Sequence, residues 1–304
     1  MADVTPSILL LGATGQVGHE LRRTLAPLGT VHTPDRPTAD LAAPTSLRRT
    51  VSDVEPALIV NAAAYTDVDG AEDAPERAAT INAEAPGVLA EAARDTGAWL
   101  VHYSTDYVFD GTKHAPYTED DTPNPINLYG RTKRHGEEAI RDAGGRHVIL
   151  RTSWMYSHRR SNFVRTMLRL AEEKDRLTVV DDQIGVPTWA GWCAEATATI
   201  CERLLADDDA SRTGIYHLAG TGQTSWYGFA QAIFAQFGRT DVTVEPVSSD
   251  EYDTAAPRPA YTVLDSSRTR AAFDLPDTPW TAQLSRFREH VASLDDKIEA
   301  LGAS

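Results

Sequence analysis

A tyrosine and a lysine four residues apart are the first side chains in this sequence that could do chemistry. Tyr129 and Lys133 fall on a helix predicted over 128–142, and residues four apart share one helix face. An ammonium beside a phenol favours the phenolate, so the pair predicts a lowered pKa for Tyr129 and a usable acid or base near neutrality. Thr105, just beyond a predicted strand, supplies a hydroxyl that would polarise and orient a carbonyl. The three residues together predict acid–base chemistry at a carbonyl group.

The glycine-rich segment 12–18 has the spacing of a phosphate-binding turn. It reads Gly-Ala-Thr-Gly-Gln-Val-Gly, follows a strand predicted over 7–12 and opens a helix predicted over 16–27. Glycines permit a tight turn and a close approach to a pyrophosphate, and a helix N-terminus offers free N–H groups. A tight turn without a ligand is the alternative, but the strand–turn–helix context favours a nucleotide. The candidate cofactor contacts here are Gly12, Thr14, Gly15, Gln16, Val17 and Gly18.

The residues that would meet the 2′ position of a dinucleotide follow the second predicted strand, over 30–33. Asp35 lies about 20 residues past the glycines, where a carboxylate would bond a ribose 2′-OH and select NAD. Arg36 would instead meet the 2′-phosphate of NADP, and Asp40 and Leu41 are candidates to flank the adenine. A solvated loop explains these residues equally well. The choice between NADPH and NADH therefore stays open, with a slight preference for NADPH.

Alternating strands and helices must position these residues. In the first half, further strands are expected over 57–62, 98–104 and 147–153, and further helices over 45–54 and 78–96, the last bent or delayed at Pro86. This alternation predicts an α/β fold, a Rossmann-type doubly wound parallel sheet with helices on both faces. The second half is less regular, with helices expected over 162–173, 189–206, 227–237 and 280–301 and a strand over 215–218. We expect an NAD(P)-binding Rossmann domain over 1–153. Residues 154–304 are expected to form mainly a smaller C-terminal substrate-binding lobe, with some segments returning to the first domain.

The glycine turn, Thr105 and the Tyr-x-x-x-Lys pair resemble the extended short-chain dehydrogenase/reductase superfamily. Four further segments narrow the resemblance to the dTDP-4-dehydrorhamnose reductase family. They are residues 61–69 (NAAAYTDVD), 104–111 (STDYVFDG), 151–154 (RTSW) and 182–188 (DQIGVPT). The resemblance covers most of the chain. It implies NAD(P)H-dependent reduction of the C4 ketone of a dTDP-4-dehydro-6-deoxy-L-hexose, either dTDP-4-dehydro-L-rhamnose or a close relative such as a dihydrostreptose precursor.

The resemblance also implies roles for individual residues. Tyr129 is the general acid, Lys133 its partner and Thr105 the donor on the carbonyl side. Cofactor contacts are expected from Ala62, Ala63, Ala64, Tyr129 and Lys133. Substrate contacts are expected from Thr66, Val68, Thr105, Tyr107, Trp154 and Arg258, although Tyr107 and Trp154 could equally be structural aromatics. Residues 258–264 read Arg-Pro-Ala-Tyr-Thr-Val-Leu where the family has Arg-Pro-x-Asn-Ser-x-Leu, so the exact sugar stays open.

The composition argues against several other classes of protein. The chain has 304 residues, and 29 Lys+Arg against 44 Asp+Glu give a net charge of −15. That balance disfavours a nucleic-acid binder and electrostatic docking on anionic membranes. No apolar run approaches the ~20 residues of a membrane span, and no signal peptide is recognisable, so a cytoplasmic protein is expected. Cys193 and Cys201 are too few for a disulfide framework and are expected to pack in the core.

No metal ligands are assigned from the sequence. The nine histidines show no His-x-x-x-His pair, and although some members of the family require Mg²⁺, no ligand set for it can be identified. Two other functions stay open: an epimerase or dehydratase acting on a nucleotide sugar, and a non-catalytic regulatory subunit on the same fold. The intact Thr105, Tyr129 and Lys133 set argues against the regulatory subunit. The pathway, the product stereochemistry and the oligomeric state also stay open. A homodimer is the one oligomeric state that we put forward as an expectation.

Overall fold

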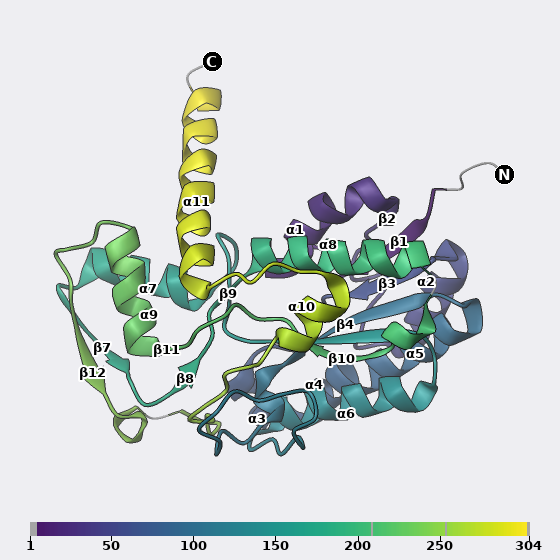
Figure 1. Ribbon diagram of the computed structural model, residues 1–304, viewed down its shortest axis with the longest axis horizontal. Helices are drawn as coiled ribbons and strands as arrows, with labels where there is room; N and C mark the ends of the chain where they lie inside the picture. Colours follow the sequence, from purple (N-terminus) through teal and green to yellow (C-terminus); the bar gives the residue numbers. More distant parts are fainter. Residues whose placement is uncertain (1–4, 208, 253, 303–304) are drawn as a thin grey trace.

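A six-stranded parallel sheet forms the centre of the protein (Figure 1). The computed structural model describes residues 5–207, 209–252 and 254–302, with side chains to residue 294. In spatial order the strands are β2 (Thr30–His32), β1 (Ser7–Leu11), β3 (Leu58–Asn61), β4 (Trp99–Thr105), β5 (His147–Thr152) and β10 (Gly214–His217), and every neighbouring pair is parallel. The prediction of a Rossmann-type sheet is confirmed.

Helices cover both faces of the sheet, because alternate strand residues point into two separate cores. Leu9 and Leu11 of β1 pack with α2 (Pro44–Val54), α5 (Ala85–Thr96) and α6 (Leu128–Ala143). Ile8 and Leu10 pack on the other side with α1 (Gln16–Leu25) and α8 (Ala190–Asp207). Strands buried on both faces read as continuous apolar runs, which is why the sequence predicts them well.

The helix expected over 78–96 is divided into three elements. They are α4 (Pro75–Ala79), the π-helical turn η2 (Thr80–Glu84) and α5, with Pro86 in the first turn of α5, where its missing N–H is tolerated. The carbonyl of Asn82 would point at residue 86 in a regular α-helix, but Pro86 has no N–H to donate, and the oxygen faces α6 instead. A Cβ on Gly136 of α6 would lie 2.1 Å from that oxygen. The interruption thus lets α6 approach closely, and the Asn82 side chain bonds the Tyr65 backbone and the Thr132 hydroxyl.

The second half of the chain contributes to two parts of the molecule. α8 and β10 belong with the sheet, whereas the smaller part contains α7 (Phe163–Glu173), α9 (Trp226–Gln236) and the parallel pair β7 (Arg176–Val180) and β12 (Thr243–Val247) (Figure 1). The elements that the sequence did not predict are β7, β12, α3 (Val68–Asp73), α10 (Ser267–Phe273), and the two-residue strands β6 (Met155–Tyr156), β8 (Ile184–Gly185), β9 (Thr188–Trp189) and β11 (Thr224–Ser225). The domain boundary at residue 153 stays a prediction. Residues 1–4 of the first expected domain and residues 208, 253 and 303–304 of the second lie outside the described residues. α11 (Trp280–Gly302) ends the described chain and extends away from the rest of the molecule in Figure 1.

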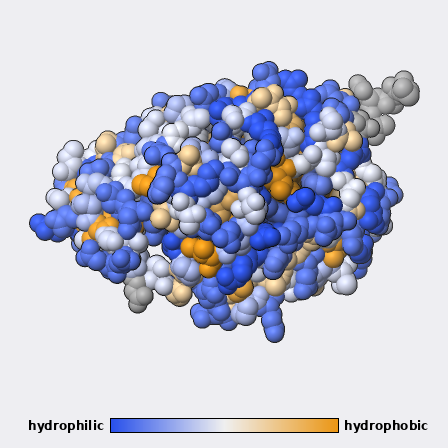
Figure 2. Space-filling model, turned by 60° about the horizontal axis from the view of Figure 1, so that its bottom comes forward, coloured by the Kyte–Doolittle hydropathy of each residue, from blue (hydrophilic) through white to orange (hydrophobic). Residues whose placement is uncertain are grey.

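Few large hydrophobic side chains are exposed in the part of the chain that is described. None of its helices is both long enough and apolar enough to cross a membrane. The face shown in Figure 2 is mostly hydrophilic, with hydrophobic residues in small separate groups. Tyr252 is the one large hydrophobic side chain that is well exposed among the described residues. A surface of this kind is ordinary for a protein with a net charge of −15.

Candidate active site

The glycine turn lies where the order of the strands changes direction. β1 lies between β2 and β3, and ligands of doubly wound sheets bind at the carboxyl edge beside such a position. Gly12 has a φ of +78°, and a Cβ on it would lie 2.7 Å from the backbone of Ala62 and Ala63. A Cβ on Gly18 would lie 2.0 Å from the carbonyl oxygen of Gly12, while Val17 is buried in the core. Both glycines are therefore required by the close packing of the turn.

The start of α1 fits the pyrophosphate of a dinucleotide. Gly15 is its N-cap, and no side chain caps the helix, so its first N–H groups are available to an anion. Thr14 is exposed at the turn. The side chain of Gln16 is engaged elsewhere, because its Oε1 accepts hydrogen bonds from Ser157 Oγ at 3.0 Å and Asn162 Nδ2 at 3.1 Å. We therefore expect Gln16 to meet a cofactor through its backbone.

The loop after β2 uses Asp35 internally and leaves Arg36 exposed. Asp35 Oδ1 accepts hydrogen bonds from the Thr38 hydroxyl at 2.6 Å and the Thr38 N–H at 3.1 Å, which lower the pKa of Asp35. The Arg36 side chain is 64% exposed and lies 3.4 Å from Asp40 Oδ1. Leu41 is buried. Arg36 uses only its Nε in its contact with Asp40, so its two terminal nitrogens remain available to a ligand, whereas Asp35 keeps only Oδ2 outside the bonds within its loop.

Residues 62–64 form the other side of the glycine turn. The Ala62 N–H donates to the carbonyl oxygen of Leu11 at 3.1 Å, and the Ala63 N–H donates to Asn61 Oδ1 at 3.2 Å. Asn82 holds the next residue, because its side chain accepts from the Tyr65 N–H at 2.9 Å and donates to the Tyr65 carbonyl at 3.0 Å. The three alanines are half-buried, and their small side chains leave the backbone approachable beside the turn.

Thr105 and Tyr129 meet at the carboxyl end of β4. Thr105 ends the strand, and Tyr129 lies in the first turn of α6, whose N-cap Asn127 accepts from the Gly130 N–H at 2.8 Å. A Cβ on Gly130 would lie 2.1 Å from the Tyr107 carbonyl oxygen, so glycine permits the close approach of helix and loop. The Thr105 hydroxyl lies near the Tyr129 phenol and limits the rise of the pKa of that phenol. The ring of Tyr107 meets that of Tyr129 edge-on, with centroids 5.9 Å apart.

The electrostatics of Tyr129 correct one prediction. Burial raises the pKa of Tyr129 to about 12. The Lys133 ammonium turns instead to the Tyr103 carbonyl oxygen, to which it donates at 2.6 Å, and lies 3.1 Å from His102 Nε2. The prediction that Lys133 lowers the pKa of Tyr129 towards neutrality is therefore wrong for this arrangement. Burial also lowers the pKa of Lys133 itself, to about 8.

A buried polar chain joins Lys133 to the glycine turn. From Lys133 the chain continues through His102, whose Nδ1 lies 3.1 Å from Asn61 Nδ2, and Asn61 Oδ1 accepts from the Ala63 N–H. Burial lowers the pKa of His102 well below its usual value, so the imidazole is neutral. The sequence analysis did not single out Asn61 or His102. The available signal was a polar residue within an otherwise apolar buried strand, which requires a buried partner.

Asp106 places a carboxyl group directly beside Thr105 and Tyr107. Its Oδ1 accepts from the Thr105 hydroxyl at 3.1 Å, whereas its Oδ2 has no hydrogen-bond partner among the described residues. Burial raises the pKa of Asp106 to about 7, and the nearby hydroxyls of Thr262 and Thr105 limit that rise. A carboxyl with such a pKa changes its charge near neutral pH. The sequence analysis quoted this residue within a motif without giving it a role.

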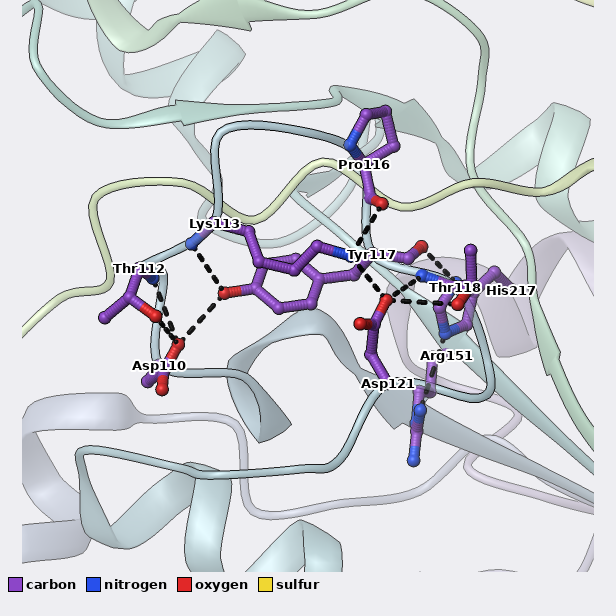
Figure 3. A network of polar contacts seen from close by, with 9 residues as sticks. All are labelled: Asp110, Thr112, Lys113, Pro116, Tyr117, Thr118, Asp121, Arg151 and His217. Atoms are coloured by element: carbon purple, nitrogen blue, oxygen red, sulfur yellow. Dashed lines mark hydrogen bonds and ion pairs between the residues drawn. The ribbon is translucent and has the colours of Figure 1, made fainter.

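The loop between β4 and α6 is held by the polar network in Figure 3. The Tyr117 hydroxyl donates to Asp110 Oδ1 at 3.0 Å and accepts from the Lys113 N–H at 3.3 Å. Asp121 Oδ2 accepts from Lys113 Nζ at 2.7 Å and from the Thr118 N–H at 2.7 Å. These contacts brace the connection between Thr105 and Tyr129, so that the two side chains keep their relative position.

Arg258 ties a C-terminal segment to α3, the short helix that follows β3 in the chain. Its Nη2 lies 2.8 Å from Asp69 Oδ2 in α3, and its Nη1 donates to the Ala256 carbonyl at 3.2 Å. Val68 begins α3 and is half-buried, whereas Thr66 is exposed. The structure thus brings three of the expected substrate contacts to one edge of the sheet.

Trp154 lies among aromatic residues of the smaller part. Its backbone has a φ of +42°, and its ring stacks on Trp226 with centroids 3.5 Å apart. A Cβ on Gly185 would lie 2.4 Å from the indole. These contacts fit the structural alternative stated for Trp154, and its contact with a substrate stays a prediction.

Comparisons with known proteins agree with the motifs. The family model described as RmlD substrate binding domain matches residues 6–293. A dTDP-4-dehydrorhamnose reductase of Burkholderia thailandensis is 46% identical over 281 residues, covering 89% of this chain and 94% of that protein. One of Salmonella typhimurium is 41% identical over 290 residues, covering 92% and 96%. The crystal structure of a dTDP-4-dehydrorhamnose reductase of Bacillus anthracis in complex with NADP superimposes with a TM-score of 0.86 at 36% identity, covering 93% of this chain and 98% of that one. The chain therefore belongs to the dTDP-4-dehydrorhamnose reductase family, as its motifs indicate.

Proposed function

We propose that this protein is an NAD(P)H-dependent reductase of the C4 ketone of a dTDP-linked 4-keto-6-deoxy-L-hexose, with dTDP-4-dehydro-L-rhamnose as the first candidate. The observation that carries the proposal is the placement of Thr105 and Tyr129 together at the carboxyl end of β4, where the Thr105 hydroxyl limits the rise of the Tyr129 pKa. The two residues lie at the same edge of the sheet as a glycine turn suited to a pyrophosphate. The relatives at 46% and 41% identity are named for this reaction, which supports the same substrate class.

Tyr129 acts as the general acid in this proposal, and Thr105 orients the ketone oxygen. NAD(P)H, when bound, supplies the hydride. The phenol of Tyr129 donates its proton to the oxygen of the reduced carbon. The Thr105 hydroxyl, which donates to Asp106 Oδ1 at 3.1 Å in this structure, would turn to donate its one proton to the same oxygen. A pKa near 12 suits this direction, because the phenol stays protonated at neutral pH. An alkoxide is a stronger base than a phenolate, so the proton transfer is favourable.

Lys133 is proposed to contact the cofactor ribose, as the family resemblance implies. The Tyr103 carbonyl oxygen and His102 hold its amino group at 2.6 Å and 3.1 Å. With a pKa of about 8, Lys133 is mostly charged at neutral pH. We propose His102 and Asn61 as positioning residues, because they connect Lys133 with the backbone at Ala63 on the cofactor side.

NADPH is the cofactor we propose, held by the glycine turn and residues 62–64. Arg36 is exposed and would bind the 2′-phosphate, whereas Asp35 is already hydrogen-bonded within its loop. Asp40 and Leu41 remain our candidates for the adenine side. The Bacillus anthracis relative, described in complex with NADP, supports this choice.

The substrate is proposed to lie over Thr66, Val68, Thr105, Tyr107, Trp154 and Arg258. The departure from the family pattern at 261–262 bears on its identity. Thr262 keeps a hydroxyl beside Asp106, which supports an unchanged substrate class. Tyr261 is new in kind, and its hydroxyl donates to Gln223 Oε1 at 3.0 Å. If the substrate carries a different sugar, Tyr261 is therefore the first residue at which we expect the difference in specificity to arise.

The remaining expectations concern setting and assembly. Cys193 and Cys201 are buried free thiols, and burial raises the pKa of each to about 12, so they are packing residues as expected. Unpaired thiols support a cytoplasmic location. The homodimer stays a prediction. No group of three carboxylates among the described residues is arranged to hold a metal ion, so Mg²⁺ lacks support.

Steady-state oxidation of NADPH and NADH with dTDP-4-dehydro-L-rhamnose tests the proposal. We expect substrate-dependent oxidation with NADPH preferred, and one reduced sugar whose configuration NMR establishes. Oxidation of neither cofactor, in a protein that binds them, would reject this substrate. Interconversion of nucleotide sugars without net oxidation, with NAD⁺ retained on purification, would indicate an epimerase instead.

A further inference from the structure

We propose that His19, Glu20 and His158 form a binding site for a divalent transition-metal ion of the zinc class. His19 and Glu20 are consecutive residues of α1, and His158 lies in the loop that follows β6. The ion would link the helix behind the glycine turn to that loop. Nothing in the proposed reduction uses these three side chains.

The three ligand atoms already lie close together. One atom from each residue can be chosen so that all lie within 4.8 Å of one another. Glu20 Oε1 and His158 Nδ1 are 3.7 Å apart. Two ligands bound to tetrahedral zinc at ordinary bond lengths are roughly 3.4 Å apart. The separations between the ligand atoms would therefore have to shorten by at most about 1.4 Å (4.8 minus 3.4), which small rotamer adjustments can supply.

Unsatisfied polar atoms at this position are a second, independent observation. His158 Nδ1 is buried and has no hydrogen-bond partner in the described part of the chain. The Glu20 side chain is only 5% exposed, and its contacts with His158 at 3.7 Å and Arg23 at 3.8 Å are both longer than a hydrogen bond. A buried polar atom without a partner costs about 1–3 kcal/mol, and a metal ion would satisfy both groups.

The chemistry of the three groups selects the class of ion. An imidazole with the ordinary pKa of about 6.5 is mostly neutral at pH 7 and offers a lone pair to a metal ion. Two neutral imidazoles and one carboxylate suit Zn²⁺, Co²⁺, Ni²⁺ or Cu²⁺, whereas Mg²⁺ prefers an all-oxygen set.

Three protein ligands would leave one position of a tetrahedral ion for a further ligand. His290 of α11 lies close by, with its ring centroid 5.3 Å from that of His158, and its Nε2 is also buried without a partner among the described residues. Gln16 of α1 already bonds Ser157 and Asn162 on either side of His158 in the sequence. A bound ion would thus reinforce an existing connection between the helix of the glycine turn and this loop.

Zinc binding to the full chain, purified without a histidine tag and stripped with a chelator, tests the proposal. Competition with a chromophoric zinc indicator should give one Zn²⁺ per chain in the wild type. His158→Gln and Glu20→Gln should each weaken zinc binding by at least tenfold to hundredfold. That is the loss typical of replacing a residue that only hydrogen-bonds a metal ligand, and these variants replace the ligands themselves. His114→Gln, which alters an exposed histidine elsewhere, should leave binding unchanged.

A second measurement keeps the proposal falsifiable if one variant folds poorly. Co²⁺ should produce visible ligand-field bands in the wild type and in His114→Gln but not in His19→Gln. Circular dichroism without metal establishes that each variant is folded. Equal affinity for Zn²⁺ in the wild type and in every folded variant of His19, Glu20 and His158, or no stoichiometric binding at all, would overturn the proposal. The test needs no substrate, so its outcome is separate from that of the proposed reaction.

Discussion

Replacing Asp106 by asparagine should stabilise the protein at neutral pH. The carboxyl is buried beside Thr105, and one of its oxygens has no hydrogen-bond partner among the described residues. Its pKa is raised from 3.8 to about 7, mainly by burial. The unfolded chain releases this proton near the ordinary pKa. Between these two values the folded protein holds a proton that the unfolded chain has lost, so stability falls as the pH rises.

The raised pKa sets the size of the effect. Each pH unit in this window costs about 1.4 kcal/mol of unfolding free energy, so the whole interval corresponds to roughly 4 kcal/mol. Asparagine stays neutral and can still accept the hydrogen bond from Thr105, but it adds an N–H that needs a partner. We therefore expect Asp106→Asn to equal the wild type within about 1 kcal/mol near pH 4. At pH 8 it should exceed the wild type by about 2–4 kcal/mol.

Urea denaturation of Asp106→Asn and of the wild type between pH 4 and pH 8 measures this effect directly. The difference between their free energies of unfolding cancels the contributions of the other titrating groups. Asp110→Asn is the matched control. Hydrogen bonds from Asn124, Thr112 and Tyr117 hold the pKa of Asp110 at about 2, so its ionised form is stabilising and the substitution should lower stability at pH 7. A constant difference between Asp106→Asn and the wild type across the whole range would refute the reasoning. It would mean that Asp106 is ionised in the folded protein.

Three changes affect the reaction itself. Arg36→Ala should raise KM for NADPH by about tenfold or more, because a charge-assisted bond to the 2′-phosphate is lost, and should leave KM for NADH unchanged. Steady-state kinetics with both cofactors measure this. An equal rise of KM for NADPH and NADH would contradict the prediction. Gly130→Ala should lower kcat by about a hundredfold, because the new Cβ would lie 2.1 Å from the Tyr107 carbonyl oxygen and displace Tyr129. An unchanged kcat would mean that this contact does not position Tyr129. Moderate salt should speed substrate association in stopped-flow measurements, because it screens the repulsion between a net charge of −15 and a polyanionic substrate. A rate that falls with salt would indicate that a local positive field guides the substrate instead.

The sequence predicts the fold well where burial leaves a regular pattern. Each sheet strand of the first half lies within one residue of its expected bounds. The clearest case is β1 (Ser7–Leu11), because a strand covered on both faces is a continuous apolar run. The strands β8 (Ile184–Gly185) and β11 (Thr224–Ser225) have two residues each and carry no period to detect. Their positions depend on packing around Trp154 and on pairing between distant segments.

The candidate site divides in the same way. The meeting of Thr105 and Tyr129 was predictable, because each follows a recognisable local pattern. The raised pKa of Tyr129 was not, because it depends on burial and on the partner that the Lys133 amino group takes. The cluster of Glu20 and His158 was equally invisible, since these residues are far apart in the sequence and neither belongs to a metal-binding motif.

The most direct test of the central claim is the kcat of Tyr129→Phe for NADPH oxidation with dTDP-4-dehydro-L-rhamnose, beside Tyr156→Phe as control. The control removes a buried hydroxyl that has no hydrogen-bond partner among the described residues, so its kcat should match the wild type. Tyr129→Phe should lower kcat by about 10²–10⁴-fold while the protein still binds NADPH, because only the proton donor is lost. A kcat for Tyr129→Phe close to that of the wild type would contradict the account, since another group would then supply the proton.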